Sequence, residues 1–191
     1  MIRVNSKEYQ CWHELGHAFT CLHYGGDVEF VEFVNDPKSK GIARARCSTN
    51  TTIRQYVACG GFAAEFYLLR SGNLGNLNEQ WIAQEVFKNA TIDRELYFNK
   101  LPGSNFTKEE DTEFMNLAVQ YVKPILERYQ SELNVAVQEL LRNDRIEGHR
   151  LKEIIGITSV TNHCNLHTDS KTSSIDLWGK FKKFLKNKFS R

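Results

Sequence analysis

The amino-acid sequence predicts one mainly α-helical domain with a small β-hairpin. Its 191 residues, 41% of them hydrophobic, can bury one sizeable core but not two ordinary domains and a linker. Apolar residues recur at helical spacing over residues 6–24, 52–69 and about 108–142. The segments 28–34 and 41–47 have the composition and alternation of strands instead.

The first helix and the hairpin have recognisable ends. Asn5 and Glu8 have the spacing of a capping box, and Gly25-Gly26 should end the helix. Turn-forming residues at 36–40 separate the two predicted strands. The next helix, over 52–69, contains Gly60-Gly61, and each glycine weakens a helix by about 1 kcal/mol relative to alanine. We therefore expect another part of the chain to pack closely against bare backbone there.

Further helices are expected in the second half of the chain. One lies around 79–88, and Thr107 with Glu110 forms a capping box that opens a long helical region over 108–142, kinked at Pro124. A short last helix covers 148–155. Polar residues then follow, so we expect a domain over 1–156, a polar linker over 157–175 and a basic amphipathic helix over 176–191.

Charge is distributed unevenly along the chain. Six of the 25 basic residues lie in 177–191, which contains no acid, so the first 176 residues hold 19 basic and 23 acidic residues. A mildly acidic body argues against a nucleic-acid partner. The apolar residues of the tail fall within about 140° of a helical wheel. Such a helix can contact an anionic membrane surface, dock on a protein partner or pack on its own domain.

Cysteine usage and hydropathy bear on the compartment. The five cysteines are odd in number and scattered, and no CxxC pair occurs. Reduced thiols in a cytoplasmic protein are therefore expected. No apolar run approaches the roughly 20 residues of a membrane span. The sequence thus favours a cytoplasmic protein, with peripheral membrane contact through the tail as an alternative.

The segment His13-Glu14-Leu15-Gly16-His17 is an HExxH motif inside the first predicted helix. The two histidines differ by about 40° in azimuth and about 6 Å along the axis, so both rings can reach one ion. Glu14 can hydrogen-bond a water on that ion and accept its proton. The alternative is a chance pattern, but the apolar surroundings would then leave three polar side chains buried without partners. The motif predicts a catalytic Zn²⁺ site, which needs a third protein ligand.

His23 stands where HExxHxxGxxH would place a third histidine, but Thr20 replaces the glycine at which that pattern turns. On a continuous helix, His23 lies about 15 Å along the axis from His13 and roughly 80° around it. We therefore do not expect it to bind the same ion.

Residues 9–18, YQCWHELGHA, followed by 60–65, GGFAAE, resemble the peptidase domain of the FtsH family of ATP-dependent zinc proteases. The resemblance covers about 7–156 and implies a zincin-like fold with metallopeptidase activity. It also implies a third zinc ligand, an aspartate on a helix beyond the double glycine, for which Asp93 is the closest match. Glu65 and Asp111 are the reserve candidates for this ligand. The other role open to Glu65 is that of an outer partner that orients a histidine, and for Asp111 that of a first-turn carboxylate that favours its helix dipole.

Two departures qualify the resemblance. Phe62 stands where the family commonly has arginine, and the sequence contains neither the ATPase module nor the membrane anchors. We therefore expect a zinc-dependent peptidase that acts on unfolded or flexible polypeptides, or that works with a separate ATPase partner. Two alternatives stay open: a non-catalytic zinc-bearing binding or regulatory module of the same fold, and an interaction protein that acts through its tail. Retention of Glu14 argues against the module, since a structural zinc needs no base.

Overall fold

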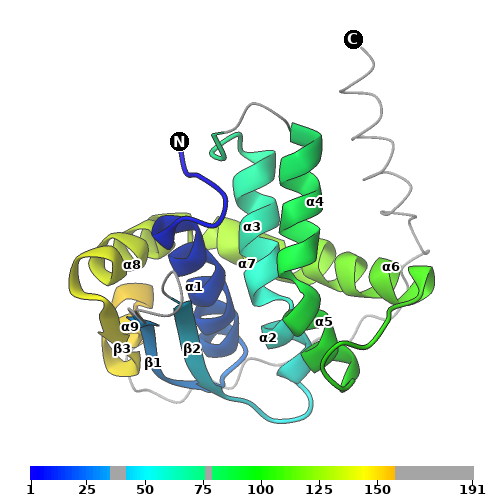
Figure 1. Ribbon diagram of the computed structural model, residues 1–191. Coiled ribbons are helices and arrows are strands. Elements are labelled where there is room, and N and C mark those ends of the chain that lie inside the picture. The colour runs from blue at the N-terminus through cyan, green and yellow to red at the C-terminus, as the bar shows by residue number, and fades with distance from the viewer. Residues whose placement is uncertain (35–41, 76–78, 158–191) are drawn as a thin grey trace.

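The computed structural model describes residues 1–34, 42–75 and 79–157 (Figure 1). The predicted hairpin turn, nearly all of the predicted linker and the whole predicted tail helix lie outside these residues. In chain order the elements are α1 (Lys7–His23), β1 (Asp27–Val34), β2 (Ile42–Ser48), α2 (Arg54–Ala58), α3 (Gly60–Arg70), α4 (Glu79–Asn89), α5 (Thr91–Phe98), α6 (Lys108–Leu117), the π-helical segment η1 (Ala118–Val122), α7 (Lys123–Arg128), α8 (Gln130–Asn143), β3 (Arg145–Glu147) and α9 (Gly148–Ile155).

The predicted mainly helical fold with a small hairpin is confirmed, and the sheet gains a third strand. β1 and β2 pair antiparallel, and β3 pairs antiparallel with the other side of β1, so the order is β2-β1-β3. Val31 on the central strand faces Ala45 on β2 and Ile146 on β3. The three residues of β3 had no strand signal of their own, because so short a segment shows no alternation.

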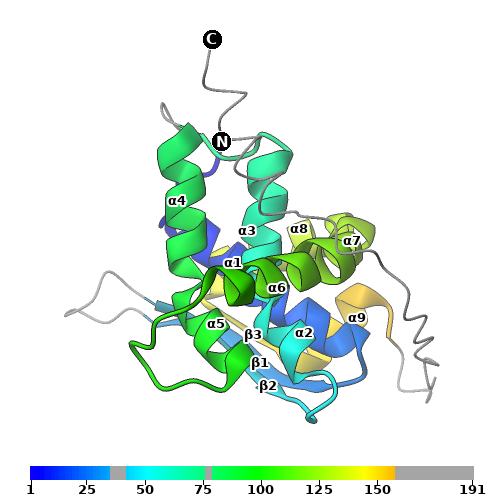
Figure 2. The same ribbon diagram turned by 90° about the vertical axis from the view of Figure 1, so that its right-hand side faces the viewer.

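Helix α1 runs through the middle of the molecule, between the sheet and α3 (Figures 1 and 2). Its N-cap is Ser6, whose hydroxyl accepts the N–H of Tyr9 at 3.2 Å. The predicted capping residue, Asn5, is wrong by one position, since Asn5 adopts a left-handed conformation with φ of 60° just before the cap. Gly25, with φ of +78°, follows the end of the helix.

The double glycine lets α3 approach α1 until their backbones touch. A Cβ atom at Gly16 would lie 2.4 Å from the Gly60 carbonyl oxygen, and one at Gly60 would lie 2.6 Å from the Gly16 carbonyl oxygen. The expected close packing is therefore present. The predicted continuous helix over 52–69 is wrong, because the chain breaks into α2 and α3 at Cys59. The Cys59 N–H is shared between the carbonyls of Gln55 and Tyr56, which interrupts the regular ladder.

The predicted long helix over 108–142 is also interrupted. The capping box of Thr107 and Glu110 forms at the start of α6, as expected. A π-helical turn then ends at Val122, directly before α7, in which Pro124 occupies the first turn. Proline lacks an N–H and its ring pushes away the carbonyl four residues earlier, which favours such a local rearrangement. A second break at Tyr129 separates α7 from α8.

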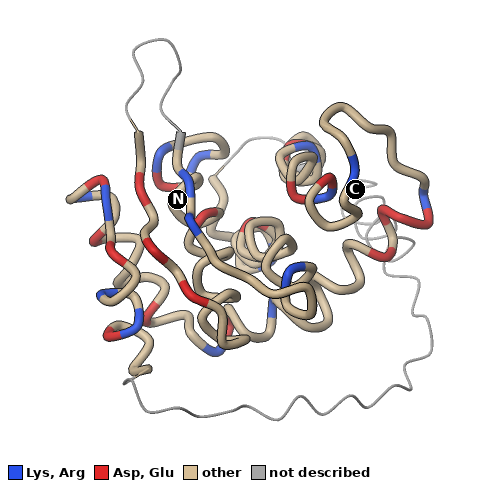
Figure 3. The backbone as a smooth tube through the Cα atoms, turned by 90° about the horizontal axis from the view of Figure 1, so that it is seen from below, with Lys and Arg blue, Asp and Glu red and all other residues tan. Residues whose placement is uncertain are grey.

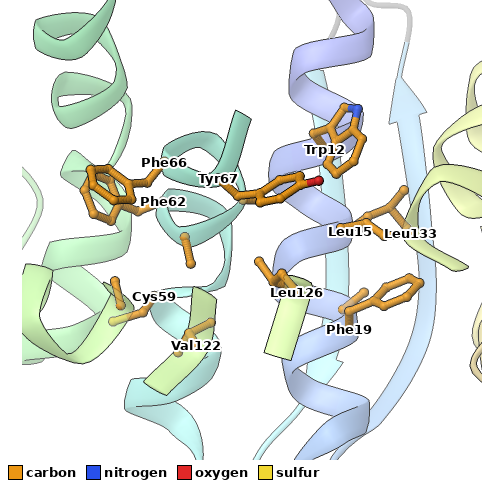
Figure 4. Close-up of a cluster of buried hydrophobic side chains, with 14 of the residues drawn as sticks. Trp12, Leu15, Phe19, Cys59, Phe62, Phe66, Tyr67, Val122, Leu126 and Leu133 are labelled. Atoms are coloured by element: carbon orange, nitrogen blue, oxygen red, sulfur yellow. The ribbon is translucent and has the colours of Figure 1, made fainter. Parts of the chain in front are cut away.

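The core lies between α1, α3 and the helices of the C-terminal half (Figure 4). Phe62 is completely buried, with its ring centroid 5.4 Å from that of Phe114, 5.9 Å from that of Phe66 and 6.0 Å from that of Phe87. An arginine at this position would bury a charge among aromatic rings. An apolar ring therefore fits position 62. Further buried members labelled in Figure 4 are Trp12, Leu15, Phe19, Tyr67, Leu126 and Leu133.

The surface of the described part carries charges of both signs. Figure 3 shows basic and acidic positions over the whole described part, and in the hairpin β1 carries the acidic ones and β2 the basic ones. On the sheet, for example, Glu32 pairs with both Arg44 and Arg145. None of the helices in the described ranges has the length and apolar character needed to cross a bilayer.

Candidate metal centre

Three predicted ligands meet in one place. His13 and His17 project from successive turns of α1, and Asp93, only 4% exposed, comes from the first turn of α5. The two Nε2 atoms are 3.1 Å apart, and Asp93 lies 3.3 Å from His17 Nε2 and 3.6 Å from His13 Nε2. Ligand atoms at about 2.0 to 2.1 Å from a tetrahedral zinc ion are about 3.3 to 3.4 Å from one another. The spacing of the three side chains therefore fits a single ion.

The outer nitrogens of both imidazoles are occupied. His17 Nδ1 is 2.6 Å from the Val57 carbonyl oxygen, and His13 Nδ1 is 2.7 Å from Glu65 Oε1. A carbonyl can only accept, so His17 Nδ1 carries the proton, and the same assignment for His13 gives its N–H to the carboxylate. The Nε2 lone pairs then face each other at 3.1 Å. Two lone pairs at this distance repel unless a proton or a metal cation lies between them.

The charges around the two rings favour such a cation. Burial alone would lower the pKa of His13, but the carboxylates of Asp93 and Glu65 outweigh it and raise that pKa well above its ordinary value. Burial would raise the pKa of Asp93, yet His17 and His13 hold it below its usual range. Within the described residues, Asp93 Oδ2 and Glu65 Oε2 are buried without a hydrogen-bond partner. A buried carboxylate oxygen without a partner is costly, and a bound cation would satisfy Asp93.

Gly61 leaves room for the two ring nitrogens. A Cβ atom there would lie 2.3 Å from His13 Nε2 and 2.6 Å from His17 Nε2. Only glycine therefore allows both ring nitrogens to occupy their positions. The second glycine of the pair has a role at the site, whereas Gly60 serves the contact between α1 and α3.

Glu14 lies beside the three side chains and is fixed by the sheet. Its Oε2 accepts the backbone N–H of Ala45, on the edge strand β2, at 2.8 Å. Burial raises the pKa of Glu14, although the neighbouring His13 and His17 oppose the shift. A carboxylate with a raised pKa is a better proton acceptor near neutral pH than an exposed one.

Two cavities flank this group. One of about 390 Å³ is lined by His13, Glu14, His17 and Asp93, with Ile92 and Leu96 of α5 on one side. The other, of about 320 Å³, adjoins His13 and Glu14 as well and is lined further by Tyr9, Gln10, Ala43 and Glu65. The group thus borders space large enough for part of a small ligand or peptide.

The reserve candidates lie elsewhere or play other parts. Glu65 contacts the outer nitrogen of His13, so it is an outer partner of that histidine and not the third ligand. Asp111, in the first turn of α6, pairs with Arg94 at 2.6 Å and is not part of the group. His23, at the end of α1, lies 3.4 Å from the Tyr129 hydroxyl and also stays outside it.

Several further residues support the three side chains. Tyr9 is buried one turn before His13, and burial together with the Glu65 carboxylate raises its pKa far above the usual range. Asn89 donates to the Tyr9 hydroxyl at 3.3 Å. The helical spacing of Tyr9 and His13 could have indicated the first of these. The Val57 carbonyl had no signal, because any residue supplies a carbonyl.

Arg94 anchors the segment that carries Asp93. Its guanidinium carbon lies 4.4 Å from the centroid of the Phe87 ring and 4.5 Å from that of Phe106. The ion pair with Asp111 joins α5 to α6. Stacking between two rings together with a carboxylate partner fixes a guanidinium firmly. Asp93 is therefore held by its neighbour rather than by a long helix.

Comparison with known proteins does not assign a family. No protein-family model matches the chain, and no curated protein matches it.

Proposed function

We propose that this protein is a zinc-dependent metallopeptidase with a zincin-like fold, related to the FtsH-type peptidase domain. The observation that carries the proposal is the spacing of His13, His17 and Asp93, with Glu14 beside them. Two imidazoles and one carboxylate are a ligand set typical of catalytic zinc, which leaves a fourth position for water or substrate. Bound there, zinc would lower the pKa of a water molecule to about 7 and polarise a peptide carbonyl.

Glu14 is the general base of the proposed reaction. Its Oε2 is held by Ala45, so the carboxylate has a fixed direction and its second oxygen stays able to accept a proton. The carboxylate takes the proton of the attacking water and later delivers it to the leaving amine. His13 and His17 keep their Nδ1 protons directed at Glu65 and Val57, which fixes the rings. No covalent intermediate is needed.

Polypeptide is the proposed substrate because the cavity joins polar and apolar walls. Ile92 is 67% exposed and Leu96 48% exposed, and both line the cavity that Glu14 borders. Exposed apolar side chains next to a reactive site can receive an apolar side chain of a ligand. We propose flexible or unfolded segments as substrates, with a separate ATPase as a partner for folded ones. Free thiols at Cys11, Cys21, Cys47 and Cys59 suit a reducing compartment such as the cytoplasm.

Cleavage of casein and of a peptide library by the purified chain tests the proposal. We expect cleavage that a chelator abolishes and zinc restores. Glu14→Gln should lower the rate by at least about 100-fold while metal content stays at the wild-type level. His23→Ala is the matched control, because it removes a histidine of the same helix outside the site.

A second candidate is a zinc-bearing binding module without turnover. The hydrogen bond from the Ala45 amide to Glu14 favours this module, because it gives Glu14 a structural role that joins α1 to β2. Metal binding by the wild type with no cleavage of any peptide in the library would support the module and reject the peptidase.

A further inference from the structure

Arg54 is a cation at the cavity without a carboxylate partner in the described structure. It lies at the start of α2, is exposed and lines the same cavity as His13, Glu14 and Asp93. Among the described residues, its guanidinium has one hydrogen-bond partner, the Asn99 side-chain oxygen at 3.4 Å. No other lysine or arginine of the described part lines either cavity.

Several other arginines of the described part are paired with carboxylates. Arg94 contacts Asp111 at 2.6 Å, Arg145 contacts Glu32 at 2.7 Å, and Arg150 contacts Glu139 at 3.1 Å. A guanidinium offers five N–H donors in a planar fork that matches a carboxylate. Arg54 thus presents nearly all of its donors to solvent at the cavity.

The charge balance of the cavity favours an anionic ligand group. With a divalent cation in the proposed site, the negative charges of Asp93 and Glu14 cancel its charge. Arg54 then leaves the cavity with a net charge of about plus one. A sphere of 390 Å³ is about 9 Å across, which is close to the screening length of about 8 Å at physiological salt. Arg54 therefore acts on charges throughout the cavity.

We propose that Arg54 is a specificity-determining residue that binds a carboxylate of the peptide substrate. The inference rests on the proposed peptidase function. An extended peptide advances about 3.3 Å per residue, so a cavity about 9 Å across places this carboxylate within about three residues of the bond to be cleaved. The carboxylate belongs either to an Asp or Glu side chain or to a free C-terminus. Apolar neighbours in the peptide face Ile92 and Leu96.

Peptide binding to the Glu14→Gln variant tests the proposed role of Arg54, because this variant should bind peptides without cleaving them. Fluorescent hexapeptides are compared in pairs, with Glu or Gln at each position in turn and with a free or amidated C-terminus. Fluorescence anisotropy on the zinc-loaded protein gives the dissociation constants. We expect one member of a pair to bind about five- to tenfold tighter through its carboxylate. Arg54→Gln should remove that preference and leave the uncharged peptides unaffected.

Arg46→Gln is the matched control, since it also removes one positive charge. Arg46 is 68% exposed on β2, pairs with Glu29 and does not line either cavity. The Arg46→Gln variant should keep the preference for the peptide with the carboxylate. Because Arg54 is exposed, its replacement should leave the unfolding temperature near that of the parent protein. An unchanged unfolding temperature shows that the variant is folded.

The pattern among the pairs identifies the source of the carboxylate. Preference for Glu over Gln at one position supports a side chain, and preference for the free C-terminus supports a terminal carboxylate. Equal binding within every pair, a preference that survives Arg54→Gln, or no binding of any peptide overturns the proposal. Cleavage without an Arg54-dependent preference would reject this inference alone. Arg54-dependent binding without cleavage by the wild type would reject the peptidase and keep the carboxylate site.

Discussion

Gly61→Ala should remove the metal while leaving the fold intact. The new Cβ would lie 2.3 Å from His13 Nε2 and 2.6 Å from His17 Nε2. Ordinary contacts begin at about 3.5 Å, so each ring would have to move by about 1 Å. Distances in a metal site must be correct to within about 0.2 Å. Because the clash is with the ends of two side chains, the rings can move without displacing either helix.

The magnitude follows from these distances. We expect zinc affinity to fall by at least about 100-fold, since loss of a mere outer partner costs 10- to 100-fold. At a zinc concentration of about 100 times the wild-type Kd, binding stabilises the wild type by about 2.7 kcal/mol and the variant by about 0.4 kcal/mol. Without metal, alanine in a helix gains up to about 1 kcal/mol over glycine. The apo variant should therefore unfold at or slightly above the wild-type temperature.

Titration of zinc against a chromophoric chelator measures the zinc affinity. Thermal unfolding with and without zinc measures the stability. Gly60→Ala is the contrasting variant, because its Cβ would lie 2.6 Å from the Gly16 carbonyl oxygen and the His17 Cα. Backbone cannot move aside so easily, so this variant should lose fold stability with or without metal. Wild-type zinc affinity in Gly61→Ala would refute the reasoning.

Three further outcomes are expected. Glu65→Gln should weaken zinc binding by about 10- to 100-fold, because His13 Nδ1 loses its charged acceptor; a chelator titration measures it. Phe62→Ala should lower the free energy of unfolding by about 3 to 5 kcal/mol in a denaturant titration, since the ring is fully buried. Acidification should release zinc, because protons compete for His13 and His17; the zinc-dependent rise in Tm should be present at neutral pH and lost as the pH falls.

Local patterns were sufficient for the elements whose partners lie nearby in sequence. The periodicity around His13 predicts α1, and the predicted strands correspond to β1 and β2, which pair antiparallel over 27–34 and 42–48. Gly16 and Gly60 touch although they are far apart in the chain, so the apolar pattern alone could not show this contact. The glycine pair did indicate a close approach, but not which helix would supply it.

The site was predictable only in part, for a similar reason. His13, Glu14 and His17 are fixed by helical geometry alone. Asp93 is brought to them by the packing of α5, about 80 residues later in the chain, and the family resemblance rather than any local pattern selected it. Glu65 had two open roles, which the structure separates by placing its carboxylate against His13 Nδ1 instead of Nε2.

Zinc content of the purified chain and of Asp93→Ala, together with X-ray absorption at the zinc edge, tests the central claim most directly. The account predicts one zinc ion per chain, bound by two imidazole nitrogens and light-atom oxygen ligands, with occupancy strongly reduced in Asp93→Ala. A chain that binds no zinc, or one whose zinc spectrum and occupancy are unchanged in Asp93→Ala, would contradict it.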